Sequence, residues 1–290
     1  MKKTILLTGG SGFIGRRFLK IHAQDFEIRS VSLRNTLVED IDLNGVKSVV
    51  YLTGIAHRMD QPEGQIYYDV NAYLAEKLAK QAKLKGVNHF VYISTVKVYG
   101  ESYSKIPLNE KSDCKPEDDY GKSKLLGEEL IQKLQDERFK VAIVRPPMVY
   151  GPGVKGNMLR LMKLIEKYPF LPFGNIPNLR SMVYVDNLNT LIQTIILQKA
   201  AGVFIAGDKP PISTSELIGY IYKGMEKADR NFSIPFFIRN IIRILKPSVY
   251  NRLFGSFVIE TKTTNRILKF EPPFSTEFGI REMVSGYKKT

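Results

Sequence analysis

The chain is poor in the residue types that cross-link proteins or hold transition metals. Among its 290 residues there is one cysteine, Cys114, which excludes an intramolecular disulfide and a metal cluster held by cysteines alone. The three histidines, His22, His57 and His89, lie far apart in the sequence with no HxxxH spacing. We therefore expect no metal site.

Long apolar segments are missing as well. No stretch approaches the roughly 20 apolar residues that a membrane-spanning helix needs. The N-terminus passes from Met-Lys-Lys directly into a short apolar run, so we expect no secretory signal. The expected compartment is a reducing cytoplasm.

Acidic residues are scarce beside basic ones: 29 Asp and Glu stand against 43 Lys and Arg, a formal net charge of +14. Such a surplus suits an anionic partner, namely nucleic acid, an acidic membrane or a phosphorylated small molecule. It also occurs as ordinary surface charge that keeps a protein soluble. The lysines are dispersed, and no RNA-binding, zinc-finger or basic-helix signature is present, so we expect no nucleic acid among the partners.

The first half of the chain alternates apolar strands with helical patterns, which is typical of an α/β fold with a doubly wound parallel sheet. The expected strands are Thr4–Thr8, Phe26–Leu33, Ser48–Leu52, Phe90–Ser94 and Lys140–Val144, and the expected helices begin at Phe13 and cover Tyr67–Leu84 and Tyr120–Leu134. Beyond Gly151 prolines and glycines are frequent and the elements become shorter. We therefore predict a smaller lobe over residues 151–290, with some segments returning to the sheet.

A glycine-rich turn follows the first strand. The segment Thr8–Gly15 reads TGGSGFIG, with glycines at positions 9, 12 and 15. The first glycine permits a tight turn, the second lets the backbone approach a pyrophosphate, and the third allows close helix–strand packing. The helix N-terminus at Phe13 and Ile14 then presents free N–H groups to the phosphates. This context predicts a dinucleotide-binding Rossmann domain over residues 1–150.

The second strand ends without an acidic residue. NAD-binding folds usually carry a carboxylate there to hold the ribose 2′-hydroxyl, but this segment reads Val31-Ser32-Leu33-Arg34-Asn35. An arginine pairs well with a 2′-phosphate, so Arg34 favours NADP(H) as the cofactor, with NAD(H) as the alternative. A solvated Arg34 with no such role is the other interpretation.

Tyr120 and Lys124 stand four residues apart in an expected helix and so share one helix face. A nearby ammonium group favours the phenolate, so we expect a lowered tyrosine pKa and a usable general acid and base. A hydroxyl partner is expected at the carboxyl end of the fourth strand, where open α/β sheets bind ligands. Ser94 and Thr95 stand there.

These motifs, TGGSGFIG, STVKVYG, YGKSK and RPPMVYGPG, together resemble an extended short-chain dehydrogenase/reductase of the NAD-dependent epimerase/dehydratase family, over nearly the whole chain. The resemblance implies an enzyme that acts on nucleotide-activated sugars, with residues 151–290 mainly as the substrate-binding lobe. We also expect a homodimer. It implies Thr95, Tyr120 and Lys124 as catalytic residues, and Arg180 and Asn157 as contacts of the sugar-nucleotide diphosphate, with Ser94 also at the substrate. The implied cofactor residues are Gly9, Gly12, Phe13, Ile14, Gly15, Arg34, Thr53, Tyr120 and Lys124.

Within the family, the chain is most similar to short bacterial enzymes of surface-polysaccharide synthesis. Two reactions remain open: reduction of a UDP-4-keto-6-deoxy-N-acetylhexosamine at C4, and epimerisation of a UDP-sugar at C4. The absence of a carboxylate after the second strand favours an NADPH-using reductase. A non-catalytic dinucleotide sensor is a more distant alternative, because such proteins typically lack the Tyr–Lys pair.

Two departures from the family pattern refine this prediction. Val96 and Lys97 stand where the dehydratase branch carries Asp-Glu, so neither side chain supplies the acid of that elimination. The stretch from Arg34 to Ser48 is also short, so little room remains for the usual third strand and its preceding helix. We expect an abbreviated adenine pocket.

The segment Pro235–Pro247 is apolar nearly all round and carries Arg239 and Arg243 four residues apart. It is too short to span a bilayer. One interpretation is an interfacial helix on an anionic membrane, which makes peripheral membrane contact part of the expectation. The other is a lid helix packed in the substrate lobe. Arg252, shortly afterwards, is a further candidate contact of the substrate diphosphate.

Overall fold

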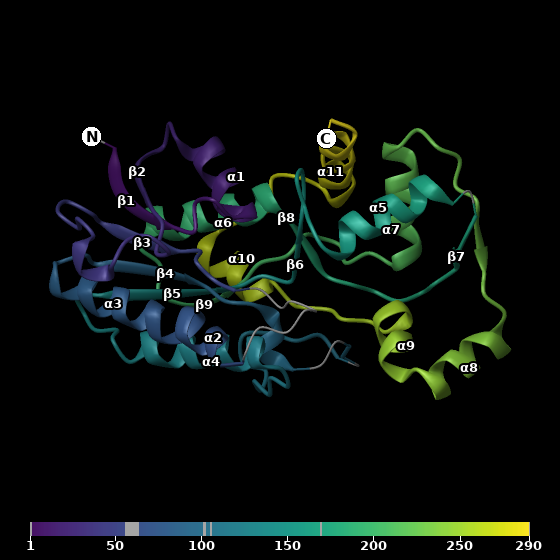
Figure 1. The fold of residues 1–290 in the computed structure, drawn as a ribbon, viewed down its shortest axis with the longest axis horizontal. Helices are drawn as coiled ribbons and strands as arrows, with labels where there is room; N and C mark the ends of the chain where they lie inside the picture. The colour runs from purple at the N-terminus through teal and green to yellow at the C-terminus, as the bar shows by residue number, and fades with distance from the viewer. Residues whose placement is uncertain (1, 56–63, 101–102, 105, 169, 290) are drawn as a thin grey trace.

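The structure is a computed structural model that describes residues 2–55, 64–100, 103–104, 106–168 and 170–289. Its centre is a six-stranded parallel sheet (Figure 1) in the order β2-β1-β3-β4-β5-β9. The strands are β1 Lys3–Thr8, β2 Phe26–Val31, β3 Ser48–Tyr51, β4 His89–Ile93, β5 Lys140–Arg145 and β9 Gly202–Ile205. All of their pairings are parallel. The predicted Rossmann class is therefore confirmed.

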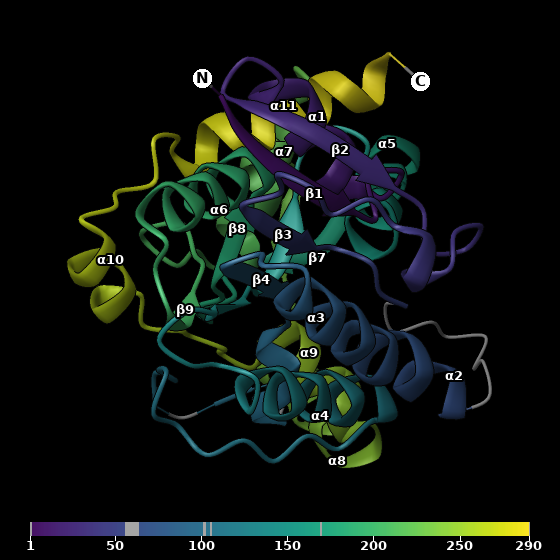
Figure 2. The same ribbon diagram turned by 90° about the vertical axis from the view of Figure 1, so that its left-hand side faces the viewer.

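Helices cover both faces of the sheet, as Figures 1 and 2 show. Helices α1 (Phe13–His22), α6 (Val185–Gln198) and α10 (Lys262–Leu268) lie on one face, and α3 (Leu74–Leu84) and α4 (Asp119–Gln132) lie on the other. The strands supply both cores because successive side chains point to opposite faces. Ile5 and Leu7 belong to the core beneath α1 and α6, whereas Leu6 belongs to the core beneath α3.

The helix expected at Tyr67–Leu84 is a compound element. It runs as α2 (Gly64–Tyr68), a π-helical turn η2 (Asp69–Tyr73) and α3 (Leu74–Leu84) without a break. A π turn places one more residue per turn than an α-helix and is often found at functional sites. The turn carries Asn71, whose side chain is fully buried.

The connection from β2 to β3 contains only a short 3₁₀ turn, η1 (Val38–Asp40). Within the described ranges, no strand pairs with β2 on its outer side, so the sheet ends there. The short spacing between Arg34 and Ser48 predicted that little regular structure would fit in this connection. The region beside β2, where the adenine pocket is expected, is therefore built from turns alone.

A third core is formed mainly by the second half of the chain. Helices α5 (Asn157–Lys167), α7 (Thr214–Gly224) and α11 (Thr276–Lys288) enclose it together with the strand pair β6 (Met148–Tyr150) and β8 (Met182–Tyr184). A further parallel pair joins β7 (Leu171–Gly174) to β10 (Asn231–Ser233). The last part of the sheet comes from this half of the chain, because β9 pairs with β5. The division at residue 150 stays a prediction.

One helix at the edge of the molecule is exposed to solvent along its length. Helix α8 (Phe236–Leu245) lies at the edge of the molecule in both Figures 1 and 2, and helix α9 (Pro247–Phe254) follows it in the chain. Among the side chains of α8 that the structure describes, none is buried. This exposure does not fit a lid helix packed in the lobe. In the part of the chain that is described, no helix is long and apolar enough to cross a membrane.

Candidate active site

The carboxyl ends of β1, β3 and β4 lie side by side, because the three strands are neighbours in a parallel sheet. The chain leaves β1 toward β2 on one side and later returns to β3 on the other side, so the order reverses between β1 and β3. Open α/β sheets bind ligands at such a reversal. The glycine turn follows β1, Thr53 follows β3, and Thr95 follows β4. The predicted site residues from these three strands are thus brought to one edge.

The glycine turn has no space for larger side chains. Gly9 adopts a φ of +72°, and a Cβ there would lie 2.7 Å from the backbone nitrogen of Thr53. A Cβ at Gly15 would lie 2.3 Å from the carbonyl oxygen of Gly9. Helix α1 starts at Phe13 with Gly12 as its N-cap, so no side chain caps its first N–H groups. This is the arrangement that a helix N-terminus needs to bind a phosphate through its backbone.

The surroundings of Thr53 and Lys124 indicate whether a dinucleotide fits beside this turn. The Thr53 hydroxyl is buried and finds no hydrogen-bond partner among the described residues. A Cβ at the neighbouring Gly54 would lie 3.2 Å from the ammonium nitrogen of Lys124. The buried Thr53 hydroxyl without a partner fits a polar ligand such as the nicotinamide ribose. The contact at Gly54 places the Lys124 ammonium one residue away from it.

Arg34 lies in the turn after β2, and its side chain is exposed. That position agrees with the expected place of a 2′-phosphate, at the carboxyl end of the strand next to β1. Its role in choosing between NADP(H) and NAD(H) stays a prediction.

Tyr120 stands in the first turn of α4, which Asp118 caps by accepting a hydrogen bond from the Gly121 amide at 2.7 Å. Thr95 forms a hydrogen bond with the Tyr120 hydroxyl, which lowers the pKa of the phenol, but burial is the larger influence and raises that pKa to about 12. The expected lowering of the tyrosine pKa by Lys124 is therefore wrong for the protein alone. The physical reason is that an enclosed phenol loses the water that would stabilise its anion.

Lys124 is buried and its ammonium group points toward the strand ends. Its Nζ donates to the carbonyl oxygen of Ile93 at 2.9 Å and lies 4.8 Å from the centre of the Tyr92 ring. Burial lowers the pKa of Lys124 to about 7, against a smaller opposite influence of Glu128. The lysine is thus held between the ends of β3 and β4, at Ile93 and beside Gly54.

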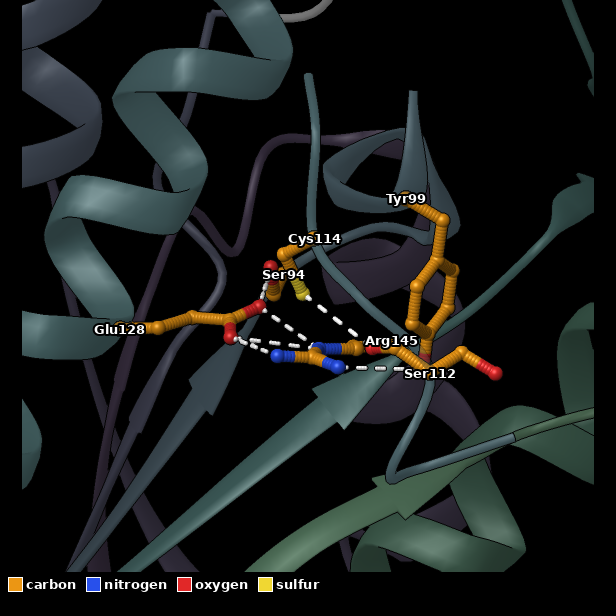
Figure 3. A network of polar contacts seen from close by, with 6 residues as sticks. All are labelled: Ser94, Tyr99, Ser112, Cys114, Glu128 and Arg145. Carbon is orange, nitrogen blue, oxygen red and sulfur yellow. Dashed lines mark hydrogen bonds and ion pairs between the residues drawn. The ribbon is translucent and has the colours of Figure 1, made fainter. Parts of the chain in front are cut away.

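A buried network beneath the site, shown in Figure 3, was not predicted from the sequence. Glu128 on α4 pairs with Arg145 at the end of β5, with Nη2 and Oε2 2.5 Å apart. Ser94 donates its hydroxyl hydrogen bond to the same carboxylate, and Arg145 donates to the Tyr99 hydroxyl at 3.0 Å. In this structure the Ser94 hydroxyl donates to Glu128. Its predicted contact with the substrate stays a prediction. Sequence spacing offered one signal: Glu128 follows Lys124 by four residues on the same helix face.

Asn71 is a second residue that sequence analysis missed. Its side chain accepts a hydrogen bond from the Ile55 amide at 3.0 Å, and it donates to the Ile55 carbonyl at 3.2 Å and to Ser123 at 3.0 Å. It thereby ties the segment after β3 to α4, one residue before Lys124. The π turn that carries it leaves no clear pattern in the sequence.

The predicted substrate residues lie in the second half of the chain. Asn157 is exposed at the first position of α5. Arg180 is partly buried, its Nη1 donates to the carbonyl of Gly255 at 3.0 Å, and burial lowers the pKa of its guanidinium. Arg252 lies on α9, three residues before Gly255. The structure thus brings Arg180 next to the segment that carries Arg252. Their contact with a diphosphate stays a prediction.

Three comparisons with known proteins bear on this site. The model of the NAD dependent epimerase/dehydratase family matches residues 5–207. A UDP-glucose 4-epimerase of Vibrio cholerae is 33% identical, over 99% of this chain and 96% of that protein. An N-acetyl-α-D-glucosaminyl-diphospho-ditrans,octacis-undecaprenol 4-epimerase of Escherichia coli O157:H7 is 30% identical, over 81% of this chain and 76% of that protein.

Solved structures share the fold at lower identity. A UDP-glucuronic acid 4-epimerase from Bacillus cereus, in complex with NAD, superposes with a TM-score of 0.77 at 20% identity and covers 99% of both chains. A dTDP-4-dehydrorhamnose reductase from Bacillus anthracis, in complex with NADP, also reaches 0.77 at 18% identity and covers 100% of both chains. The same architecture therefore serves proteins that bind either dinucleotide.

Proposed function

Because the chain belongs to the NAD dependent epimerase/dehydratase family, we propose that it is an enzyme that epimerises the sugar of a UDP-sugar at C4. The single observation that carries this proposal is the meeting of Thr95, Tyr120 and Lys124 beside the glycine turn. A non-catalytic dinucleotide sensor has no use for this constellation. The substrate class proposed is UDP-glucose or UDP-N-acetylglucosamine.

The chemistry needs one group to exchange a proton with the C4 oxygen while a hydride moves at C4. A bound nicotinamide supplies the hydride exchange, and the positive charge of its oxidised ring favours the phenolate of a neighbouring tyrosine. Tyr120 takes the proton from the C4 hydroxyl and later returns it. Thr95, already hydrogen-bonded to Tyr120, holds the C4 oxygen. Lys124 holds the ribose and adds a positive charge when protonated.

The choice between epimerase and reductase rests on the relatives. The protein that is 33% identical over nearly the whole chain is a UDP-glucose 4-epimerase, and this supports the second of the two reactions left open by the sequence. Reduction of a UDP-4-keto-6-deoxy-N-acetylhexosamine uses the same residues. It differs in that the enzyme takes reduced cofactor from solution in every cycle, whereas an epimerase regenerates its own.

A second candidate substrate differs only beyond the diphosphate. The relative at 30% identity acts on a sugar diphosphate joined to a polyprenol. The solvent-exposed apolar side chains of α8 favour this candidate, because a polyprenol substrate lies in a membrane. This candidate shares the sugar and the diphosphate with UDP-N-acetylglucosamine, and the reaction at C4 with both UDP-sugars.

The test is an incubation of the purified protein with UDP-glucose or UDP-N-acetylglucosamine and NAD, with no added reductant, followed by NMR of the sugar. We expect the two C4 epimers to interconvert. Consumption of NADPH with a UDP-4-keto-6-deoxy sugar, without any interconversion, would establish the reductase instead. Size-exclusion chromatography with light scattering tests the homodimer, which stays a prediction.

A further inference from the structure

Helix α8 displays its apolar side to solvent. Phe237, Ile241, Ile244 and Leu245 are 65%, 52%, 76% and 73% exposed. Their spacing of four, three and one residues places them on one stripe of the helix. In a packed amphipathic helix such a stripe faces the core, so α8 has the opposite orientation.

Arg239 lies on the side of α8 opposite the apolar stripe and contacts helix α9. The guanidinium of Arg239 lies 4.8 Å from the centre of the Phe254 ring on α9, and Arg239 is less exposed than the apolar stripe. This contact fixes the helix through its polar face. The outward direction of the apolar stripe is therefore set by packing against α9.

The segment of the chain that carries the stripe has charges of one sign. Between Asp229 and Glu260 the sequence contains five basic residues and no acidic residue. They are Arg230, Arg239, Arg243, Lys246 and Arg252. A second copy of this chain that paired through the same stripe would bring these like charges together. An anionic surface would neutralise them.

We propose that α8 lies flat in the headgroup region of an anionic lipid bilayer, with Phe237, Ile241, Ile244 and Leu245 inserted among the acyl chains. Ten residues of helix extend only about 15 Å, which suits a helix that lies in the interface rather than one that spans it. Phe232, just before the helix and 52% exposed, adds an aromatic side chain to the same segment. This inference goes beyond the proposed function, because it holds for either reaction at C4.

Docking through α8 would place part of the substrate lobe at the membrane. Helix α9 follows α8 after one residue, Lys246. The carbonyl of Gly255, directly after α9, accepts the hydrogen bond from Arg180. The candidate diphosphate residue is thus one helix away from the proposed lipid surface.

The experiment is vesicle flotation of the full chain with phosphatidylcholine alone and with phosphatidylcholine mixed with phosphatidylglycerol. We expect binding only to the anionic vesicles, and weaker binding as salt rises. The double variant Ile241→Glu/Ile244→Glu should lose binding by at least roughly tenfold, since each buried isoleucine contributes that order. Arg243→Glu should weaken binding by about fivefold for each unit of charge removed.

The matched control is Leu84→Glu, which changes a leucine that is 86% exposed at the end of α3. It should float as the wild type does. Equal loss in this control, or no binding of the wild type to anionic vesicles, would overturn the proposal. The proposal would also be overturned if the double variant bound vesicles as the wild type does but had a smaller oligomeric mass, because α8 would then join two copies of the chain.

The same variants should keep the wild-type turnover of a soluble UDP-sugar, because α8 contributes no residue to the candidate site. Failure of the membrane proposal therefore leaves that activity intact. Failure of the proposed function would instead remove the activity while lipid binding stayed.

Discussion

Glu128 and Arg145 form a buried ion pair that joins helix α4 to the end of strand β5. Arg145 donates from Nη2 to Oε2 at 2.5 Å and from Nε to Oε1 at 3.1 Å. Both side chains are at most 7% exposed. Because Glu128 also accepts from Ser94, the pair fixes the strand end that leads into Thr95.

Removing one member of this pair should destabilise the protein strongly. Glu128→Met or Arg145→Met alone leaves an unpaired buried charge, which costs about 3–5 kcal/mol. The double variant should cost clearly less than the two single costs combined, which urea unfolding measures. The control is the exposed pair Lys77–Glu39, 2.7 Å apart and 55% exposed on both sides, whose single variants should each cost at most about 1 kcal/mol. Additive costs at Glu128 and Arg145 would contradict the ion pair.

Replacing Tyr120 by phenylalanine should remove the proton carrier and leave the fold unchanged. We expect Tyr120→Phe to lose about 10²- to 10⁴-fold in turnover, the range for a lost general acid or base. Dinucleotide affinity, measured by fluorescence titration, should change little. Tyr73→Phe, at a tyrosine that is 49% exposed, is the control and should turn over normally. A Tyr120→Phe enzyme as fast as the wild type would remove Tyr120 from the mechanism.

Lys124 should weaken the fold in a pH-dependent manner. Burial lowers its pKa from 10.5 to about 7, so between these values the unfolded chain binds a proton that the folded chain does not. Stability therefore falls by about 1.4 kcal/mol for each unit of pH decrease in that window. Lys124→Met does not lose stability in this way and should be more stable than the wild type, although inactive. The difference in the free energy of unfolding between the two should widen as pH falls from 10 to about 7.

Urea unfolding across that pH range measures the gap between wild type and Lys124→Met. The matched control is Lys122→Met, at an exposed lysine on the same helix, which should leave the pH dependence unchanged. A gap that is constant with pH would mean that Lys124 keeps its proton in the folded protein.

Arg34 should decide the preference between the two dinucleotides. Arg34→Glu puts a like charge against a 2′-phosphate and an acceptor beside a 2′-hydroxyl, so the ratio of NADPH to NADH affinity should fall by roughly tenfold or more. Competitive calorimetry with both cofactors measures this ratio. Arg138→Glu, an exposed residue just before the amino end of β5, should leave the ratio alone. If Arg34→Glu does so too, Arg34 is a solvated surface residue.

Strand positions and the shared helix face of Tyr120 and Lys124 could be predicted because each depends on local pattern. Parallel strands are apolar runs, and residues four apart on a helix share a face. The glycine turn could likewise be predicted, because the spacing of its glycines indicates a tight turn with close backbone packing. These features need no knowledge of distant contacts.

Other features depend on contacts between distant segments and could not be read from local pattern. The raised pKa of Tyr120 comes from what surrounds the ring, not from the lysine one turn away. The π turn at Asn71 depends on hydrogen bonds to Ile55 and Ser123. The apolar segment at 235–247 predicted a helix, but only its contact with α9 shows which side faces outward.

The early end of the sheet at β2 leaves an open backbone edge, and such edges invite pairing with another chain. Here the strand has six residues and carries Glu27 and Arg29. The Arg29 guanidinium also donates to the carbonyl of Asn44 at 2.8 Å and pairs with Asp42, which fastens the following loop beside the strand. Because no further strand covers β2, the charged side chains of Glu27 and Arg29 protect this edge against pairing with another chain.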